Sequence, residues 1–222
     1  PLRPYVDEVA DEPGRLRVGF TTKAPTGVPV DEVCVHAVAS TARLLEELGH
    51  EVFEAAPVWP DADEMLSSFI VVWNTGGALM DVSDWSAVER LNAAMHDQAL
   101  ATDSIAYVQA VAKMQIFSRM ITASWGRDFD LFLTPTMAVE PPPVGAVWEG
   151  YESDPLAPLM NAAAMVPFTP WFNVTGQPAI SLPLETSPGG LPIGVQLVGA
   201  PWGESQLIRV AAQLERAAPW RG

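Results

Sequence analysis

The sequence has very little cysteine and little positive charge. Its 222 residues include one cysteine, Cys34, so an internal disulfide is excluded. A lone cysteine fits a reducing compartment, and we expect a cytoplasmic location. Twelve Lys and Arg stand against 27 Asp and Glu, which gives a formal net charge of −15. Nucleic acid and anionic lipid repel a chain this acidic, so we expect neither as a partner.

Long apolar runs and ligand-binding motifs are also missing from the sequence. No apolar run reaches the roughly 18 residues that a spanning helix needs. No pair of histidines has metal-ligand spacing, and Gly189-Gly190 lacks the lysine of a phosphate loop, so we expect no metal and no cofactor. The first residues include neither an apolar signal segment nor an initiating Met. We therefore expect the chain to begin inside a longer protein.

The composition indicates a folded domain with many irregular connections. Hydrophobic residues make up 49% of the chain and charged residues 18%, which is typical of a globular protein. There are 21 prolines and 16 glycines, the residues that favour turns and loops. Eight Trp and eight Phe are many for this size. A polypeptide that packs against a further portion of the same protein would show such a surplus.

The stretch from 173 to 199 predicts a pair of buried strands. Residues 179–184 and 193–198 are short runs of Ile, Val and Leu, and the turn residues SPGG lie between them. Such runs, bounded by turn residues, are typical of strands joined by a hairpin.

An earlier stretch predicts a parallel strand–helix–strand unit. Residues 16–20 and 51–55 have strand character, and apolar residues at helical spacing lie between them. Asp31 is a suitable N-cap and Gly49 a suitable stop for that helix. Consecutive strands joined by a helix favour a right-handed crossover in a parallel sheet.

The remaining segments are mostly helix or loop by their patterns. Residues 61–126 lack a convincing strand and predict helices that cover the sheet or cap it; the third of these helices carries its apolar residues near one face. Those residues are Ile105, Val108, Ala112, Ile116 and Met120. The segment boundaries that we predict are a linker at 1–15, helices at 61–77, 84–99, 103–125, 158–166 and 204–217, and a strand at 130–134.

Three segments resemble the amidase signature family. They are NVTGQPAISLP with the following GLPIGVQLVG, FDLFLTPTMAVEPPPVG at 129–145, and the closing ESQLIRVAAQLERAAPW. The resemblance implies an α/β fold in which a mixed sheet is covered by helices on both sides, an α/β/α arrangement. It also implies that residues 1–222 are the C-terminal portion of an amidase signature domain. Enzymes of this family hydrolyse carboxylic amides with a serine nucleophile.

The family's catalytic residues have no counterpart that we can assign in this sequence. In the family, a lysine takes a proton from a bridging serine, which relays it from the nucleophilic serine, and these residues lie upstream of the quoted motifs. Here Lys23 and Lys113 have the sequence context of surface lysines. Ser67-Ser68 lacks flanking glycines and fits a helix. We therefore assign no catalytic residue, and we expect Cys34 to be a buried, inert thiol.

The resemblance places the 173–181 segment near the substrate pocket. On that basis Thr175, Gly176 and Gln177 are candidates for substrate contacts; alternatively they only shape a turn before a core strand. Trp171 and Phe172 could line an apolar acyl pocket, or they could be core aromatics.

Two hypotheses about function follow from these observations. In the first, the protein is an amidase, and its partners are a small-molecule amide substrate and the N-terminal part of the same protein. This chain then forms part of the fold and the wall of the substrate pocket, and it is inactive alone. A narrower version is the family's subunit that amidates mischarged transfer RNA. In the second, the chain is a non-catalytic binding module that self-associates as a homodimer to cover its apolar surface.

Overall fold

The computed structural model describes residues 3–220, and its first unit is the predicted strand–helix–strand. Strand β1 (Arg17–Phe20) leads to helix α1 (Glu32–Glu47) and then to strand β2 (Glu51–Glu54). Asp31 occupies the N-cap of α1, and Gly49 leaves the helix with a φ of +96°, which glycine adopts without strain. The two strands pair in parallel, which confirms the predicted unit.

The region between β2 and the next strand is helical, as predicted, but its elements differ from the prediction. Asp61 and Asp103 cap the first and last of its helices, because their carboxylates accept hydrogen bonds from Glu64 N at 2.9 Å and Ala106 N at 2.8 Å. The single helix predicted at 84–99 is wrong: Val88 is extended, and it separates a 3₁₀ turn from a later helix. The elements are α2 (Ala62–Gly77), η2 (Trp85–Ala87), α3 (Arg90–Ala101) and α4 (Ser104–Thr122). No helix within residues 3–220 has both the length and the apolar character that a membrane crossing requires.

Strand β3 (Leu131–Pro135) is buried along its whole length. The chain then runs through a long irregular segment that contains the 3₁₀ helix η3 (Ala146–Trp148). Two short helices follow, α5 (Ala157–Met165), which the sequence predicted, and α6 (Pro170–Thr175), which it did not.

The C-terminal stretch forms the predicted hairpin and its following helix. Strands β4 (Ala179–Thr186) and β5 (Pro192–Val198) pair antiparallel, with Leu182 opposite Val195. Helix α7 has the predicted bounds, Glu204–Ala217.

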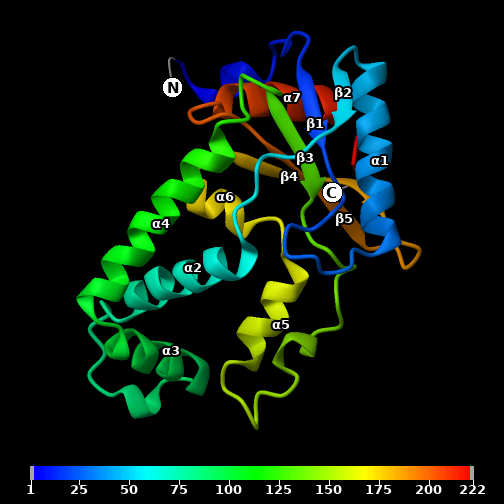
Figure 1. The fold of residues 1–222 in the computed structure, drawn as a ribbon. Coiled ribbons are helices and arrows are strands. Elements are labelled where there is room, and N and C mark those ends of the chain that lie inside the picture. Colours follow the sequence, from blue (N-terminus) through cyan, green and yellow to red (C-terminus); the bar gives the residue numbers. More distant parts are fainter. Residues whose placement is uncertain (1–2, 221–222) are drawn as a thin grey trace.

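The five strands form one mixed sheet in the order β2-β1-β3-β5-β4. β3 is parallel to β1 on one side and antiparallel to β5 on the other. Helices cover both faces of the sheet, α1 and α7 on one and α2, α4 and α6 on the other (Figure 1). This is the predicted α/β class with helices on both sides of a mixed sheet.

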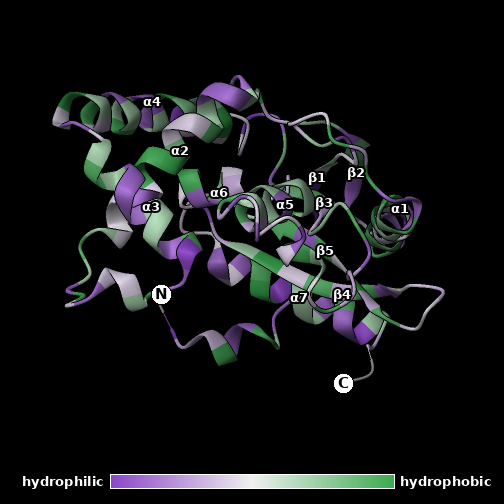
Figure 2. Cartoon of the chain, turned by 90° about the horizontal axis from the view of Figure 1, so that it is seen from below, coloured by the Kyte–Doolittle hydropathy of each residue, from purple (hydrophilic) through white to green (hydrophobic). Residues whose placement is uncertain are grey.

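Each face of the sheet has its own apolar core. The core under α1 and α7 is aliphatic, and the core under α2, α4 and α6 is aromatic. Fully buried members of the first include Val18, Val38, Leu45, Leu131, Leu133, Leu197 and Leu214. Members of the second include Phe117, Trp125, Phe129, Phe132, Trp171 and Phe172. Figure 2, a view from below, shows α1 and α4 at opposite ends of the molecule.

Residues 1–15 were predicted to be a linker, which is wrong for part of the segment. From Arg3 onward the chain packs on α7 and includes a 3₁₀ helix. A 3₁₀ helix, η1 (Tyr5–Glu8), buries the Glu8 side chain, which is 3% exposed. Arg3 Nε donates to Glu8 Oε1 at 2.8 Å, and Arg209 Nε donates to Glu8 Oε2 at 2.7 Å. The hydrogen bonds from Arg3 and then Arg209 lower the pKa of Glu8 from 4.5 to about 2, against the opposing effect of burial. Residues 1 and 2 lie outside the described part.

The apolar face predicted for α4 is not the face that packs on the protein. Ile105, Val108 and Ile116 are 65%, 62% and 49% exposed. Phe117 and Ile121, on the opposite side of the helix, are buried in the aromatic core. Helix α4 is therefore apolar on two faces, and its outer one is open.

Candidate functional site

The candidate site is organised around α6 and the turn that joins it to β4. Pro170 lies in the first turn of α6, where its missing N–H costs nothing. Gly176 ends the helix in the left-handed conformation, at a φ of +67°, and its N–H donates to the Phe172 carbonyl at 2.9 Å. Glycine is favoured at this position because other residues are strained there. The sequence therefore fixes where the chain leaves α6 and enters the sheet.

Trp171 and Phe172 point from α6 into the aromatic core. They are 0% and 3% exposed. Trp171 Nε1 donates to the Pro167 carbonyl at 2.9 Å, and the Trp171 ring lies 5.1 Å from that of Trp59. Neither side chain lines the two hollows beside α6 described below. In this structure both residues are core aromatics, which was one of the two alternatives. A substrate contact by either residue stays a prediction.

Thr175 and Gln177 hold the turn in place, while Gly176 between them is exposed. Thr175 Oγ1 accepts a hydrogen bond from Gln177 N at 3.3 Å. Gln177 is 7% exposed, and its Nε2 donates to the Gly199 carbonyl at 2.7 Å, which ties the start of β4 to the end of β5. Its Oε1 is buried and has no hydrogen-bond partner among residues 3–220. In this chain Thr175 and Gln177 have a structural role; substrate contact by Thr175, Gly176 and Gln177 stays a prediction.

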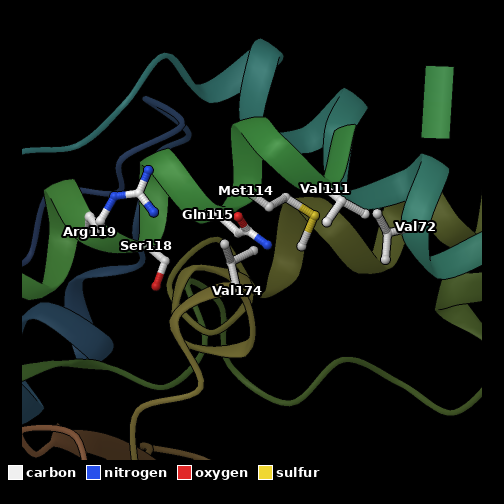
Figure 3. A pocket seen from close by; sticks show the side chains of 7 residues that line it. All are labelled: Val72, Val111, Met114, Gln115, Ser118, Arg119 and Val174. Carbon is white, nitrogen blue, oxygen red and sulfur yellow. The ribbon is translucent and has the colours of Figure 1, made fainter. Parts of the chain in front are cut away.

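A hollow of about 380 Å³ opens between α2, α4 and α6 (Figure 3). Val174 projects into it from α6, opposite the α4 side chains, and Val72 closes one end from α2 (Figure 3). Ser118 and Arg119 make the other end polar (Figure 3). The remaining lining residues are Val111, Met114 and Gln115.

A second hollow, of about 290 Å³, lies between α2, α5 and α6. Its wall is nearly all apolar, and α6 adds the polar side chains of Thr169 and Asn173. Small-molecule sites are typically apolar concavities with a few polar groups that orient the ligand. This hollow fits that description better than the larger one. Its apolar lining consists of Leu66, Phe69, Ile70, Trp73, Leu159, Met160, Ala162, Ala163, Val166 and Pro170.

A strip of hydroxyl and amide groups crosses the sheet face on the α6 side. Thr136 Oγ1, just after β3, and Ser181 Oγ of β4 are 2.7 Å apart, although β5 lies between the two strands. They meet because Gly194 of β5 has no side chain: a Cβ there would lie 2.7 Å from Ser181 Oγ. Beside them, Gln196 Nε2 donates to Thr134 Oγ1 at 3.1 Å. Polar and apolar residues alternate in β4 and β5, which is the sequence signal for this strip, and the strip was not among the predicted features.

The lysines and the serine pair do not form a catalytic arrangement. Lys23 is exposed and pairs with Glu54 at 3.4 Å, and Lys113 pairs with Glu64 at 2.6 Å. Ser68 is helical, and its Oγ donates to the Glu64 carbonyl at 2.9 Å. These positions agree with the interpretation of surface lysines and a helical serine.

Cys34, in the first turn of α1, and His50, just after the end of α1, have structural roles. Burial raises the pKa of Cys34 to about 11, which keeps the thiol protonated and inert. His50 is buried and accepts a hydrogen bond from Leu16 N at its Nδ1, at 3.2 Å, and its Nε2 lies 2.9 Å from Gln213 Oε1. Within residues 3–220 no cluster of His, Cys, Asp or Glu could hold a metal ion.

The mixed five-stranded sheet with helices on both its faces defines a domain of the α/β class. The profile of the Amidase family matches residues 1–208, so the chain belongs to the amidase family. It is 33% identical over 237 residues to the 6-aminohexanoate-cyclic-dimer hydrolase of Pseudomonas sp. strain NK87, a match that covers 98% of this chain and 47% of that protein.

Solved structures agree with this assignment. The structure of a 6-aminohexanoate cyclic dimer hydrolase superposes with a TM-score of 0.88 at 32% identity, covering 99% of this chain and 48% of that one. A bacterial aryl acylamidase of the amidase signature family shares the fold, with a TM-score of 0.75 at 20% identity, over 97% of this chain and 46% of that one. The chain thus spans about half the length of the relatives that it matches.

Proposed function

We propose that the protein hydrolyses carboxylic amides, adding water across the C–N bond to release an acid and ammonia or an amine. The observation that carries this proposal is the 33% identity with a cyclic-dimer hydrolase, which extends over 98% of the chain. Identity at this level over nearly the whole chain supports a shared reaction class as well as a shared fold.

The role that we propose for this chain is to form the later strands of the sheet and one wall of the substrate pocket. The nucleophile and its base would come from the other portion of the protein, because residues 3–220 bring no serine or cysteine together with a free base. The N-terminal part of the same protein is the proposed partner, and the chain alone is expected to be inactive. No nucleic-acid partner is proposed, and a cytoplasmic location stays a prediction.

The substrates that fit this wall are amides with an alkyl segment. The hollow between α2, α5 and α6 presents apolar side chains, with Asn173 able to donate or accept a hydrogen bond. The Pseudomonas relative named above is a hydrolase of the 6-aminohexanoate cyclic dimer, whose methylene chains suit such a wall. Linear amides remain within the proposal, and we add cyclic ones.

The test combines this chain with the N-terminal portion of the Pseudomonas relative and measures release of amine from linear and cyclic alkyl amides. The chain alone should give no turnover. If it does, and if the activity is lost in Lys23→Ala or Ser68→Ala, the proposed division of labour is wrong. If the chain and its complement associate but hydrolyse no amide, the proposed activity is wrong.

A pair of variants on α5 tests the pocket wall. Ala163 lines the hollow, whereas its neighbour Ala164 is exposed and does not. Ala163→Phe should raise KM about tenfold or more for alkyl amides while kcat changes little, because it removes ground-state and transition-state binding alike. Ala164→Phe is the matched control and should leave both constants unchanged. Equal effects of the two variants would contradict this location of the pocket.

The second candidate function is a non-catalytic, self-associating module that kept the fold. The observation that favours it is the absence, among the described residues, of an arranged nucleophile and base. Failure of every complementation experiment, together with a stable folded chain in isolation, would favour this candidate over the amidase.

A further inference from the structure

Helix α4 has a second apolar face that points away from the protein. We call Ile105, Val108, Ala112, Ile116 and Met120 the outer stripe. Steps of three and four residues place them on one side of the helix. All five are exposed, and α4 lies along the outside of the molecule in both views (Figures 1 and 2). A helix that is apolar on opposite faces is expected to be buried on both in its functional state.

The charges on α4 differ from those of the rest of the chain. The chain as a whole has a formal charge of −15, but α4 contains no Asp or Glu, and its charged residues are Lys113 and Arg119. Lys113 is paired with Glu64 of α2. Arg119, near the C-terminal end, forms no ion pair within residues 3–220. Asp103 caps the N-terminal end and is exposed. The helix thus has an available cation at one end and an anion at the other.

We infer that a second copy of this chain covers the outer stripe, with the two α4 helices antiparallel about a two-fold axis beside Ala112. Such an interface brings each residue opposite one equally far from the centre. Val108 and Ile116 lie four residues on either side of Ala112 and would face each other across the axis. Ala112 is small and permits close approach of the two helices at the centre.

The same arrangement gives charge complementarity at both ends. Arg119 lies seven residues after Ala112, so it would come within about one helical turn of Asp103 of the second copy. The antiparallel helix dipoles also favour this direction over the parallel one. A parallel pair would place Arg119 beside Arg119, two like charges without an anion nearby.

Pairing through the outer stripe leaves the candidate site open. The stripe faces away from α2 and α6, on which the opposite side of α4 packs. The hollow between α2, α5 and α6 lies beyond those helices, and α4 contributes no residue to it. Only the polar end of the first hollow, at Arg119, would border the interface. The inference therefore does not rest on the amidase activity.

A symmetric cysteine gives a direct test on the full 222-residue chain. In Ala112→Cys the new thiols lie on the axis and should form an intermolecular disulfide under mild oxidation. Ser104→Cys, also exposed, is the control: eight residues from the axis, its thiols would be about 24 Å apart, beyond the roughly 7 Å that a disulfide tolerates between Cα atoms. Cys34 is 1% exposed and should add no background. Equal cross-linking of the two variants would overturn the proposed axis.

The mass in solution tests whether the pair forms at all. Light scattering should give twice the 23.9 kDa of one chain, and Val108→Glu should weaken the dimer at least about tenfold, which corresponds to about 1.4 kcal/mol. Val144→Glu replaces another exposed valine, in the segment between β3 and η3, and should have no effect. A monodisperse 23.9 kDa species at 100 micromolar or more, large polydisperse aggregates, or capture of the stripe by the complementary N-terminal portion of a relative would each overturn the inference.

Discussion

Gly19 gives the sharpest prediction about packing. It lies in β1, in the interior of the sheet, and a Cβ there would lie 2.8 Å from Phe129 Cδ1 and 3.2 Å from the Ala55 Cβ. Phe129 has no room to withdraw. It is 0% exposed, its ring stacks on Phe132 at 5.4 Å, and Trp125 contacts it edge-on at 4.9 Å.

Two opposing effects decide the stability of Gly19→Ala. Replacing glycine in a strand gains about 0.5–1 kcal/mol, because the unfolded chain loses conformational freedom. Carbon atoms attract best at about 3.5–4.0 Å, so a 2.8 Å contact is strongly repulsive. Overpacking a close-packed core costs about 1–3 kcal/mol. The steric effect is the larger one, and we expect a net loss of about 1–2 kcal/mol.

Urea unfolding followed by circular dichroism measures this change. With a slope of about 2 kcal/mol per molar urea, the midpoint should fall by about 0.5–1 M. Gly76→Ala is the matched control: that glycine lies in α2 with nothing within 4 Å of a Cβ, so the same substitution should raise stability by about 0.5–1 kcal/mol.

A second variant identifies the cause. Adding Phe129→Leu to Gly19→Ala relieves the contact, so the double variant should lose less stability than the sum of the two single variants. The reasoning is refuted if Gly19→Ala is as stable as the parent, or if the two losses are additive.

Two further predictions concern ionisable groups. Because the pKa of Glu8 falls to about 2 on folding, its pairing stabilises the fold above pH 4.5, and this stabilisation is lost as the pH falls toward 2. The difference in stability between the parent and Glu8→Gln, measured from urea midpoints, should therefore shrink between pH 6 and pH 2.5. A constant difference would contradict the ion-pair origin. Burial raises the pKa of Cys34 to about 11, so a thiol reagent at pH 8 should react with it only after denaturant is added; rapid reaction of the native chain would contradict the buried position.

The parts of the fold that could be predicted from the sequence are those in which local pattern and burial agree. The β1–α1–β2 unit, the β4–β5 hairpin and α7 each combine an apolar repeat with a cap or turn residue, and each appears as predicted. The amidase family was identified from motifs that lie in the hairpin, around β3 and on α7. These segments form the sheet and the aliphatic core.

The predictions failed where a short-range pattern does not determine which part of the protein an apolar face packs against. Helix α6 has six residues and contains no full apolar repeat, so only the tertiary contacts of Trp171 and Phe172 reveal it. The α4 stripe has the right spacing for a buried face, but Phe117 and Ile121 on the other side pack instead. A period of 3.6 residues finds an apolar face without saying what covers it.

The site was predicted less completely than the fold. The family resemblance placed the Thr175–Gln177 turn near the substrate pocket, and that location stays a prediction. The structure supplies the local contacts that hold the turn. The hydroxyl strip needed the sheet order, because Thr136 and Ser181 are 45 residues apart and meet only across β5. The hollow beside α6 combines three helices whose packing no single segment encodes.

The neighbouring position of β1 and β3 has a consequence for how such a protein can change over time. Val18 pairs with Leu131, so the chain leaves the sheet after β1–α1–β2, forms α2, α3 and α4, and returns beside the strand from which it started. The entropy cost of closing a loop rises only by about 0.6 kcal/mol for each doubling of its length. Insertions and deletions at the α2–α3 and α3–α4 connections therefore change the free energy of forming the sheet very little. Selection can remodel this helical excursion, and with it the shape of the two hollows beside α6, while the strands beneath keep their order and register.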